Sequence, residues 1–200
     1  SVATSHFYDI FRYQILDTNS YIEEIWAYGY WAIDRCARII KEGASFKEVT
    51  KGDLTEVEGC IAQAYAIKAL CSFYLTNMFG LPYSEANKTT LGIVNVTEPV
   101  PAYSQVSRVS VEQNYSLILD DITKAKEYYA KEGVENVGKQ YMNTAAVAAL
   151  EARVKLYMKN YEGAITAAQE AITLSGGTIV STKEDYKNMY TTLAVSTEDI

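Results

Sequence analysis

The chain has 200 residues, of which 48% are hydrophobic and 22% are charged, a composition typical of a folded globular domain. Its 18 lysines and arginines form no basic run and are outnumbered by 25 acidic residues, so that the charge argues against a nucleic-acid or anionic-membrane partner. No apolar run in the sequence is long enough to span a bilayer, so we expect no part of it to insert in a membrane.

Two helices are predicted before the first proline. Residues 21–41 carry apolar side chains at intervals of three and four, and Gly43 stands where a C-terminal cap is expected. Residues 53–79 repeat this spacing, with Asp53 as the predicted N-cap. Because only a short segment separates the two helices, we expect them to form an antiparallel hairpin.

The stretch of about residues 80–109 holds all three prolines and is predicted to be an irregular insertion. The preceding helix ends at Gly80, because glycine lets the backbone turn away and Pro82 then prevents the helix from resuming. Within this insertion only GIVNVTEPV, residues 92–100, alternates enough to suggest a short strand. Any strand content is therefore expected to be local.

The second half of the chain is again helical in its pattern. SVEQ at residues 110–113 is a capping-box signature that starts a helix ending near Tyr129. Two helices follow over residues 143–159 and 161–174, and STKE at residues 181–184 starts a short sixth helix.

Alanines in the helix over residues 161–174 suggest how it pairs with its neighbour. Ala164, Ala168 and Ala171 form a small-residue seam of the kind that lets the paired helices of tetratricopeptide repeats approach closely. We therefore predict an all-α fold of tetratricopeptide-like hairpins with an irregular, proline-containing loop region. We expect residues 1–200 to form a single domain.

Catalytic chemistry has little to build on in this sequence. His6 is the only histidine, and the three cysteines form no CxxC pair and are interpreted as small core residues. The neighbouring carboxylates Glu23 and Glu24, and likewise Asp120 and Asp121, diverge by about 100° on a helix, which is typical of a solvated face. We therefore predict no catalytic residue, no metal site, no cofactor and no enzymatic activity.

Aromatic residues are the unusual feature, since 17 tyrosines accompany two tryptophans. Most of these rings fall on helix stripes and are expected in the core, but rings on loops can serve as platforms for flat apolar faces such as that of a sugar. The candidate ligand-binding residues combine loop rings with nearby polar groups: Phe11, Tyr13, Gln14, Asp17, Asn19, Tyr83 and Asn87. The alternative is that the loop rings pack beneath their own loops.

Four segments, in order, resemble the SusD-like (RagB/SusD) family of outer-membrane nutrient-binding proteins. They are WAYGYWAIDRCARII at residues 26–40, FYLTNMFGLPYSEAN at 73–87, RVSVEQNYSLILDDITKAKEYY at 108–129 and NTAAVAALEARVKLYMKNYEGAITAAQEAI at 143–172. The chain departs from the family pattern at Lys68, where arginine is usual, and at Tyr161, where tryptophan is usual. Family members are more than twice this long, so we expect the chain to be the N-terminal part of a longer protein.

The resemblance implies a non-catalytic binder of a polysaccharide, oligosaccharide or other nutrient. It implies an outward-facing lipoprotein at the cell outer membrane, whose lipid anchor lies outside this chain, and delivery of the ligand to a TonB-dependent SusC-like transporter. Two other functions stay open at this point. One is a tetratricopeptide-type scaffold that binds proteins, and the other is a helical carbohydrate-active enzyme, which would need two inward-facing carboxylates.

Overall fold

The computed structural model describes residues 8–16, 18–49, 51–177 and 180–191. Their regular structure is helical: α1 Tyr8–Phe11, α2 Ser20–Val49, α3 Thr55–Phe79, α4 Val111–Tyr129, α5 Thr144–Tyr157, α6 Tyr161–Ser175 and α7 Lys183–Thr191. Within these ranges, β pairing is limited to one antiparallel bridge between Leu91 and Ser110. The predicted all-α fold is thus confirmed. None of the described helices combines the length and the hydrophobicity that a membrane crossing requires.

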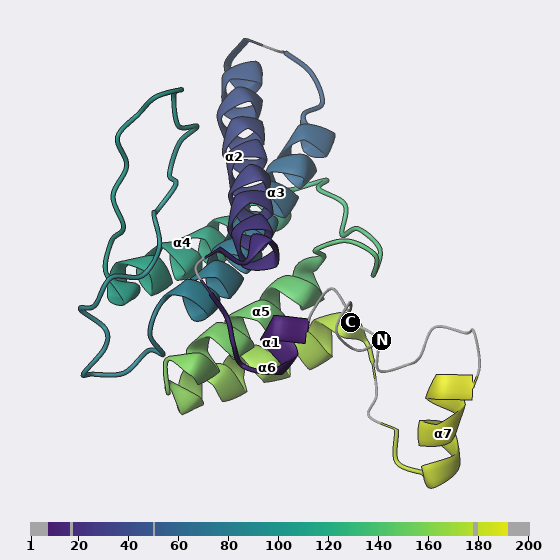
Figure 1. The fold of residues 1–200 in the computed structure, drawn as a ribbon. Coiled ribbons are helices and arrows are strands. Elements are labelled where there is room, and N and C mark those ends of the chain that lie inside the picture. The colour runs from purple at the N-terminus through teal and green to yellow at the C-terminus, as the bar shows by residue number, and fades with distance from the viewer. Residues whose placement is uncertain (1–7, 17, 50, 178–179, 192–200) are drawn as a thin grey trace.

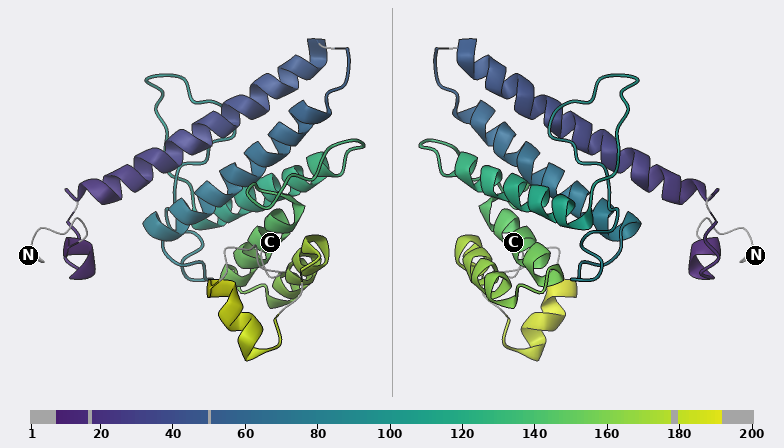
Figure 2. Two further views of the ribbon diagram at one scale, coloured as in Figure 1. Left: turned by 90° about the vertical axis from the view of Figure 1, so that its right-hand side faces the viewer. Right: turned by 90° about the vertical axis from the view of Figure 1, so that its left-hand side faces the viewer.

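Two helical hairpins and a central helix form the body of the molecule. Helices α2 and α3 run antiparallel as the longer hairpin, α4 lies along α3, and α5 and α6 form the second hairpin beside α4 (Figure 1). Both predicted hairpins are confirmed. The short helices α1 and α7 pack against none of the other described helices; α1 stands apart from the body in Figure 2, and α7 does so in Figure 1.

The buried side chains form two clusters that meet at α3. The larger cluster joins α3, α4 and α5 and includes the fully buried Phe73, Tyr115 and Ile118. The second lies between α2, α3 and the loop before α4, and it consists of Ile33, Ala37, Leu75, Ile93 and Val96. Because Ile93 and Val96 belong to the loop, burial of their side chains holds the loop against α2 and α3.

The prediction that the first long helix ends near Lys41, capped by Gly43, is wrong, because α2 continues to Val49. Gly43 lies inside the helix and faces α3, where a Cβ atom would stand only 2.8 Å from Cδ1 of Ile61. The same applies at Gly29, where a Cβ atom would meet the side chain of Leu75 at 2.9 Å. Both glycines therefore allow close approach of α2 to α3 and terminate nothing.

Of the predicted starts of the next two helices, one is wrong and one is confirmed. Helix α3 starts at Thr55 with Leu54 in the N-cap position, so the prediction of Asp53 as the N-cap is wrong, although its Oδ1 accepts the Thr55 N–H at 2.9 Å. At α4 the predicted capping box is confirmed. The Gln113 N–H donates to Ser110 Oγ at 3.2 Å, and the Ser110 N–H donates to Gln113 Oε1 at 3.0 Å.

The predicted alanine seam of α6 is partly confirmed. Ala164 and Ala171 are buried as expected, but the third buried alanine is Ala167, while Ala168 is only partly buried. Ala164 and Ala167 lie three residues apart, and Ala171 follows at four, which is the spacing of one helix face. Small side chains on this face allow α5 and α6 to pack closely, as the tetratricopeptide-like prediction requires.

Candidate functional site

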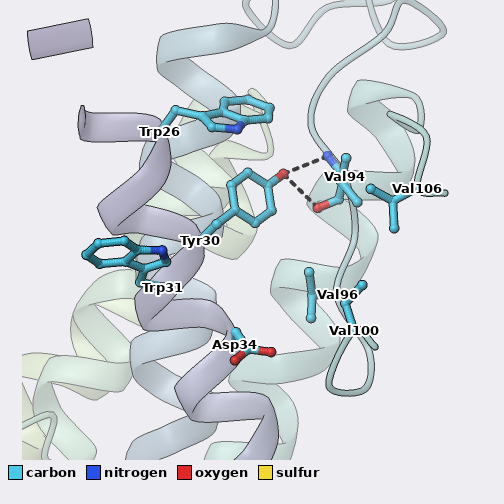
Figure 3. Close-up of a pocket in the computed structure, with 8 residues that line it drawn as sticks. All are labelled: Trp26, Tyr30, Trp31, Asp34, Val94, Val96, Val100 and Val106. Atoms are coloured by element: carbon cyan, nitrogen blue, oxygen red, sulfur yellow. Dashed lines mark hydrogen bonds between the residues drawn. The ribbon is translucent and has the colours of Figure 1, made fainter. Parts of the chain in front are cut away.

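The loop between α3 and α4 folds back alongside α2 and creates a pocket there (Figures 1 and 3). Its two ends are held together beside the bridge of Leu91 and Ser110. The Gly92 N–H donates to the Val109 carbonyl at 2.8 Å, and the Val109 N–H donates to the Ile93 carbonyl at 3.0 Å. The loop that emerges from this closed base supplies one wall of the pocket, and α2 supplies the other.

The pocket has a volume of about 340 Å³, which lies in the lower part of the range of small-molecule sites. Eight residues line it: Trp26, Tyr30, Trp31, Asp34, Val94, Val96, Val100 and Val106. Seven of these side chains are aromatic or aliphatic, and Asp34 carries the only formal charge among the eight. The pocket is therefore an apolar slot with one carboxylate, and it suits a ligand that has a flat apolar face.

Packing on three sides fixes the ring of Trp26. It meets Tyr30 at a centroid distance of 4.8 Å and the edge of Phe79 at 4.9 Å. The guanidinium of Arg108, from the far end of the loop, lies 5.2 Å from the ring centroid, a cation–π contact. A ring held in this way presents its surface to the pocket without losing side-chain freedom when a ligand binds.

Trp31 is the more accessible of the two indoles, with 56% of its surface exposed. Its ring stands edge-on to that of Tyr28 at a centroid distance of 5.1 Å. Asp34 lies one turn further along the same helix (Figure 3), and its carboxylate accepts from Arg38 Nε at 2.7 Å and Arg38 Nη2 at 3.3 Å. Each carboxylate oxygen has a second lone pair, which leaves room for hydroxyl donors from a ligand.

Tyr30 connects the two walls of the pocket. Its hydroxyl donates to the Val94 carbonyl at 3.0 Å and accepts the Val94 N–H at 2.8 Å, as Figure 3 shows. Burial raises the pKa of Tyr30 to about 12, against the smaller effect of the backbone hydrogen bond. The phenol therefore stays neutral at physiological pH and keeps the proton that it donates to the loop.

A buried ion pair supports the loop wall from behind. Lys68 of α3 places its Nζ 3.0 Å from Asp121 Oδ1 of α4 and donates to the Val96 carbonyl at 3.1 Å. The prediction that Asp120 and Asp121 share a solvated face is wrong for Asp121, which is 1% exposed, because Lys68 provides a partner inside the core. Burial raises the pKa of Asp121 to about 6.

The predicted ligand residues ahead of α2 do not line this pocket. Phe11 and Tyr13 are largely exposed, at 78% and 93%, and Gln14 is exposed as well. Asn19 caps the first turn of α2, where its Oδ1 accepts the N–H groups of residues 21 and 22 at 3.1 and 3.3 Å. Asp17 lies outside the described residues. The structure thus presents two exposed rings and a capping amide, and their role as ligand residues stays a prediction.

The two predicted residues of the loop after α3 also lie outside the pocket. The ring of Tyr83 is half-buried and meets the edge of Tyr115 at 4.9 Å, which matches the alternative that loop rings pack beneath their own loops. Asn87 Nδ2 donates to the Pro82 carbonyl at 3.0 Å and so helps to shape the turn. Their part in ligand binding likewise stays a prediction.

Of the pocket residues that the sequence interpretation missed, Trp26 and Tyr30 were expected in the buried stripe of their helix. Trp26 and Tyr30 do share the stripe that faces α3, but Trp31 follows Tyr30 directly and must point about 100° away from it. A large ring off the buried stripe of an amphipathic helix is the signal that could have drawn attention to this region. No local pattern in the sequence predicts that residues 94–106 will lie opposite these rings.

In the part of the chain that the structure describes, no cluster of three or more histidine, cysteine, aspartate or glutamate side chains could hold a metal ion. The groups that line the pocket are suited to non-covalent contacts. Its rings offer contact area and its carboxylate offers hydrogen bonding, while the eight lining residues include no nucleophile paired with a base.

Comparison with known proteins adds independent findings. Residues 3–156 match the profile of a SusD-like family described as "Starch-binding associating with outer membrane". A SusD superfamily protein from Bacteroides thetaiotaomicron is 28% identical with a TM-score of 0.71, over 82% of this chain and 35% of its own. A Bacteroides vulgatus protein of known structure is 27% identical with a TM-score of 0.80, over 98% of this chain and 43% of its own.

A laminarin-binding SusD-like protein is 20% identical with a TM-score of 0.61, which shows a shared fold. The match covers 84% of this chain and 34% of that protein. The chain thus spans less than half the length of each of these solved structures. No protein with a curated description matches it.

Proposed function

The chain belongs to the SusD-like family, and we propose that it binds a glycan without transforming it, at the outer face of the outer membrane. The family description and the laminarin-binding relative of the same fold support a carbohydrate ligand. We further propose that residues 1–200 are one domain of a longer, lipid-anchored protein that delivers its ligand to a TonB-dependent SusC-like transporter. These finer statements rest on the resemblance to the family.

The observation that carries the proposal is the aromatic pocket between α2 and the loop. The C–H face of a pyranose can lie on an indole ring, and covering about 40 Å² in this way contributes about 1 kcal/mol at ~25 cal/mol per Å². The hydroxyl groups at the edge of the sugar can donate to the carboxylate of Asp34 at the same time. Two such ring contacts contribute about 2 kcal/mol and a hydrogen bond to the carboxylate about 1.5 to 3 kcal/mol more, so the dissociation constant is expected between about 3 mM and about 200 μM.

The absence of a second carboxylate among the pocket residues supports a binder over a hydrolase. Glycoside hydrolysis usually needs two carboxyl groups that flank the scissile bond, about 5 to 10 Å apart. Asp34 is the one carboxylate that lines the pocket, and both of its oxygens already accept from Arg38. A lone, charge-paired carboxylate is suited to orienting hydroxyl groups.

One observation favours a second candidate function, binding of a protein partner. Tyr161, Ile165 and Ile172 lie on one face of α6 at helical spacing, and all three are about half exposed or more. An apolar face on a tetratricopeptide-like hairpin can receive another polypeptide. This function predicts capture of a protein partner, lost in an Ile165→Asp variant, and no retention on polysaccharides.

The glycan-binding proposal can be tested with affinity electrophoresis and calorimetry against a panel of polysaccharides. Trp31→Ala is expected to weaken binding about five- to tenfold, since it removes roughly 1 kcal/mol of ring contact. Tyr161→Ala is the matched control, because it removes an equally exposed ring from α6, away from the pocket. Absence of binding by the folded protein to every glycan, or equal losses in both variants, would contradict the proposal.

A further inference from the structure

The backbone of the loop wall is held by side chains from two helices, and we propose that Tyr30 and Asn114 are positioning residues for the pocket. Each side chain forms the backbone hydrogen bonds that a neighbouring strand would form in a sheet. Through these contacts they set where Val94 and Val96 stand relative to the indole rings of α2. The inference rests on the proposed function in one respect, that the pocket receives the ligand.

Asn114 of α4 holds residue 93. The Ile93 N–H donates to Asn114 Oδ1 at 2.8 Å, and Asn114 Nδ2 donates to the Ile93 carbonyl at 3.1 Å. This reciprocal pair of bonds is the one that two residues exchange across an antiparallel ladder. Asn114 Nδ2 also donates to Asn95 Oδ1 at 2.6 Å, and the amide is fully buried, so water does not replace its partners.

Tyr30 of α2 holds residue 94 in the same reciprocal manner, because its hydroxyl both donates to the carbonyl and accepts from the N–H. In an extended segment, the N–H and C=O groups of successive residues point to opposite sides. One helix can therefore hold only alternate residues, and the wall needs α4 on one side and α2 on the other. Lys68 of α3 then holds the carbonyl of Val96.

Gly92 makes the close approach of Asn114 possible. A Cβ atom at this position would lie 1.9 Å from Asn114 Oδ1, far inside the distance that two such atoms tolerate. The glycine is thus required by the contact with the amide of α4. This gives a second way to disturb the wall, through the loop itself, without removing a polar side chain from the core.

The experiment compares amide hydrogen exchange and glycan affinity in wild type and Tyr30→Phe. The substitution keeps the ring and removes the hydroxyl, which leaves the N–H and C=O of Val94 without their partner. We expect the Val94 amide to exchange about tenfold faster or more, by NMR, while amides in the interior of α3 keep their rates. Affinity for a glycan that binds wild type should fall several-fold, although the hydroxyl itself points to the loop.

Tyr129→Phe is the matched control. The Tyr129 hydroxyl also donates to a backbone carbonyl, that of Met142 at 2.6 Å, and burial raises its pKa to about 12 as well. Its loss should leave the Val94 amide and the affinity unchanged. Gly92→Ala should speed exchange of the Ile93 amide, because Asn114 is pushed away, and should weaken glycan binding in parallel.

An unchanged exchange rate at Val94 in Tyr30→Phe, or faster exchange spread evenly over the whole protein, would overturn the proposal. So would a Tyr30→Phe variant with faster Val94 exchange but wild-type affinity, because the wall would then be held without shaping the site. If no glycan binds even to wild type, the proposed function fails, and unchanged exchange at Val94 would separately remove the positioning role.

Discussion

At the scale of single residues, the pair Lys68 and Asp121 has the largest consequences. Asp120 and Asp121 are neighbours, yet Asp120 pairs with Lys124 on the surface at 2.6 Å, while Asp121 is buried against Lys68. The helix period places Asp121 beside the apolar stripe of Ile118 and Ala125 and places Asp120 away from it, but it does not identify the partner of Asp121. That partner, Lys68, comes from α3 and lies 53 positions away from Asp121.

The buried carboxylate gives a prediction for the pH dependence of stability. Burial raises the pKa of Asp121 from 3.8 to about 6, so the folded protein keeps this proton to a higher pH than the unfolded chain. Because the folded state binds more protons between these values, this group lowers the free energy of unfolding as pH rises from about 4 to 6. The full effect is roughly 3 kcal/mol, and the loss is complete about one pH unit above the folded pKa, near pH 7.

Urea unfolding at several pH values from 4 to 7 checks this expectation. The control is the double variant Lys68→Met with Asp121→Leu, which replaces the ion pair by apolar side chains and removes the titration. Other carboxylates shift both profiles alike, so the difference between wild type and the double variant is the quantity that matters. A difference that stays constant over the whole pH range would contradict the prediction.

At the scale of helices, the capping signals and the periodicity predicted the positions of the helices well, whereas Gly43 was wrongly interpreted as a helix end. Periodicity located α3, α4, α5 and α6 to within about two residues, and Ser110 with Gln113 marked the start of α4. Gly43 was interpreted as the end of a helix because glycine serves that purpose at many C-termini. Its actual neighbour, Ile61, comes from the partner helix and cannot be identified from the local pattern.

Gly43→Ala tests the role of this contact between α2 and α3. In an isolated helix the change would stabilise by about 1 kcal/mol. Here the new Cβ atom meets Ile61 at 2.8 Å, and Ile61 is fully buried, so the neighbour has little space to move. We therefore expect a net loss of about 1 to 2 kcal/mol in the free energy of unfolding, measured with urea.

Gly59→Ala provides the comparison within α3. A Cβ atom there has its nearest neighbour, Cγ1 of Val134, at an ordinary contact distance of 3.8 Å. The helix-propensity gain should then appear almost undiminished, as a stabilisation of up to about 1 kcal/mol. Equal effects of the two substitutions would show that close approach of α2 to α3 does not depend on Gly43.

At the scale of the whole molecule, the sequence predicts the helical architecture but not the pocket. Helices carry their own periodic signal, so the two hairpins could be assembled from the pattern alone. The pocket depends on contacts such as the one between Tyr30 and Val94, which lie 64 residues apart. The loop reaches α2 because Ile93 and Val96 are buried there, and short apolar runs in a loop do not indicate which helix they will cover.

Exposed aromatic rings stand both at the pocket and in the segment before α2, and this leads to a prediction about ligand length. Phe11 and Tyr13 are exposed and line no part of the pocket. A long polysaccharide that engages both places gains from the high effective concentration of the second contact, whereas a disaccharide can occupy only one. We therefore expect a long polysaccharide to bind about tenfold more tightly, or more, than a short oligosaccharide of the same linkage.

Calorimetry with a size series of one glycan separates the two contributions. The double variant Phe11→Ala with Tyr13→Ala should lose the advantage of the long chain and keep the affinity for the short one, since the pocket is intact. Trp31→Ala should weaken both, because the ring that it removes serves every ligand that enters the pocket. Affinity that does not rise with chain length in wild type would restrict binding to the pocket and would remove Phe11 and Tyr13 from the predicted ligand residues.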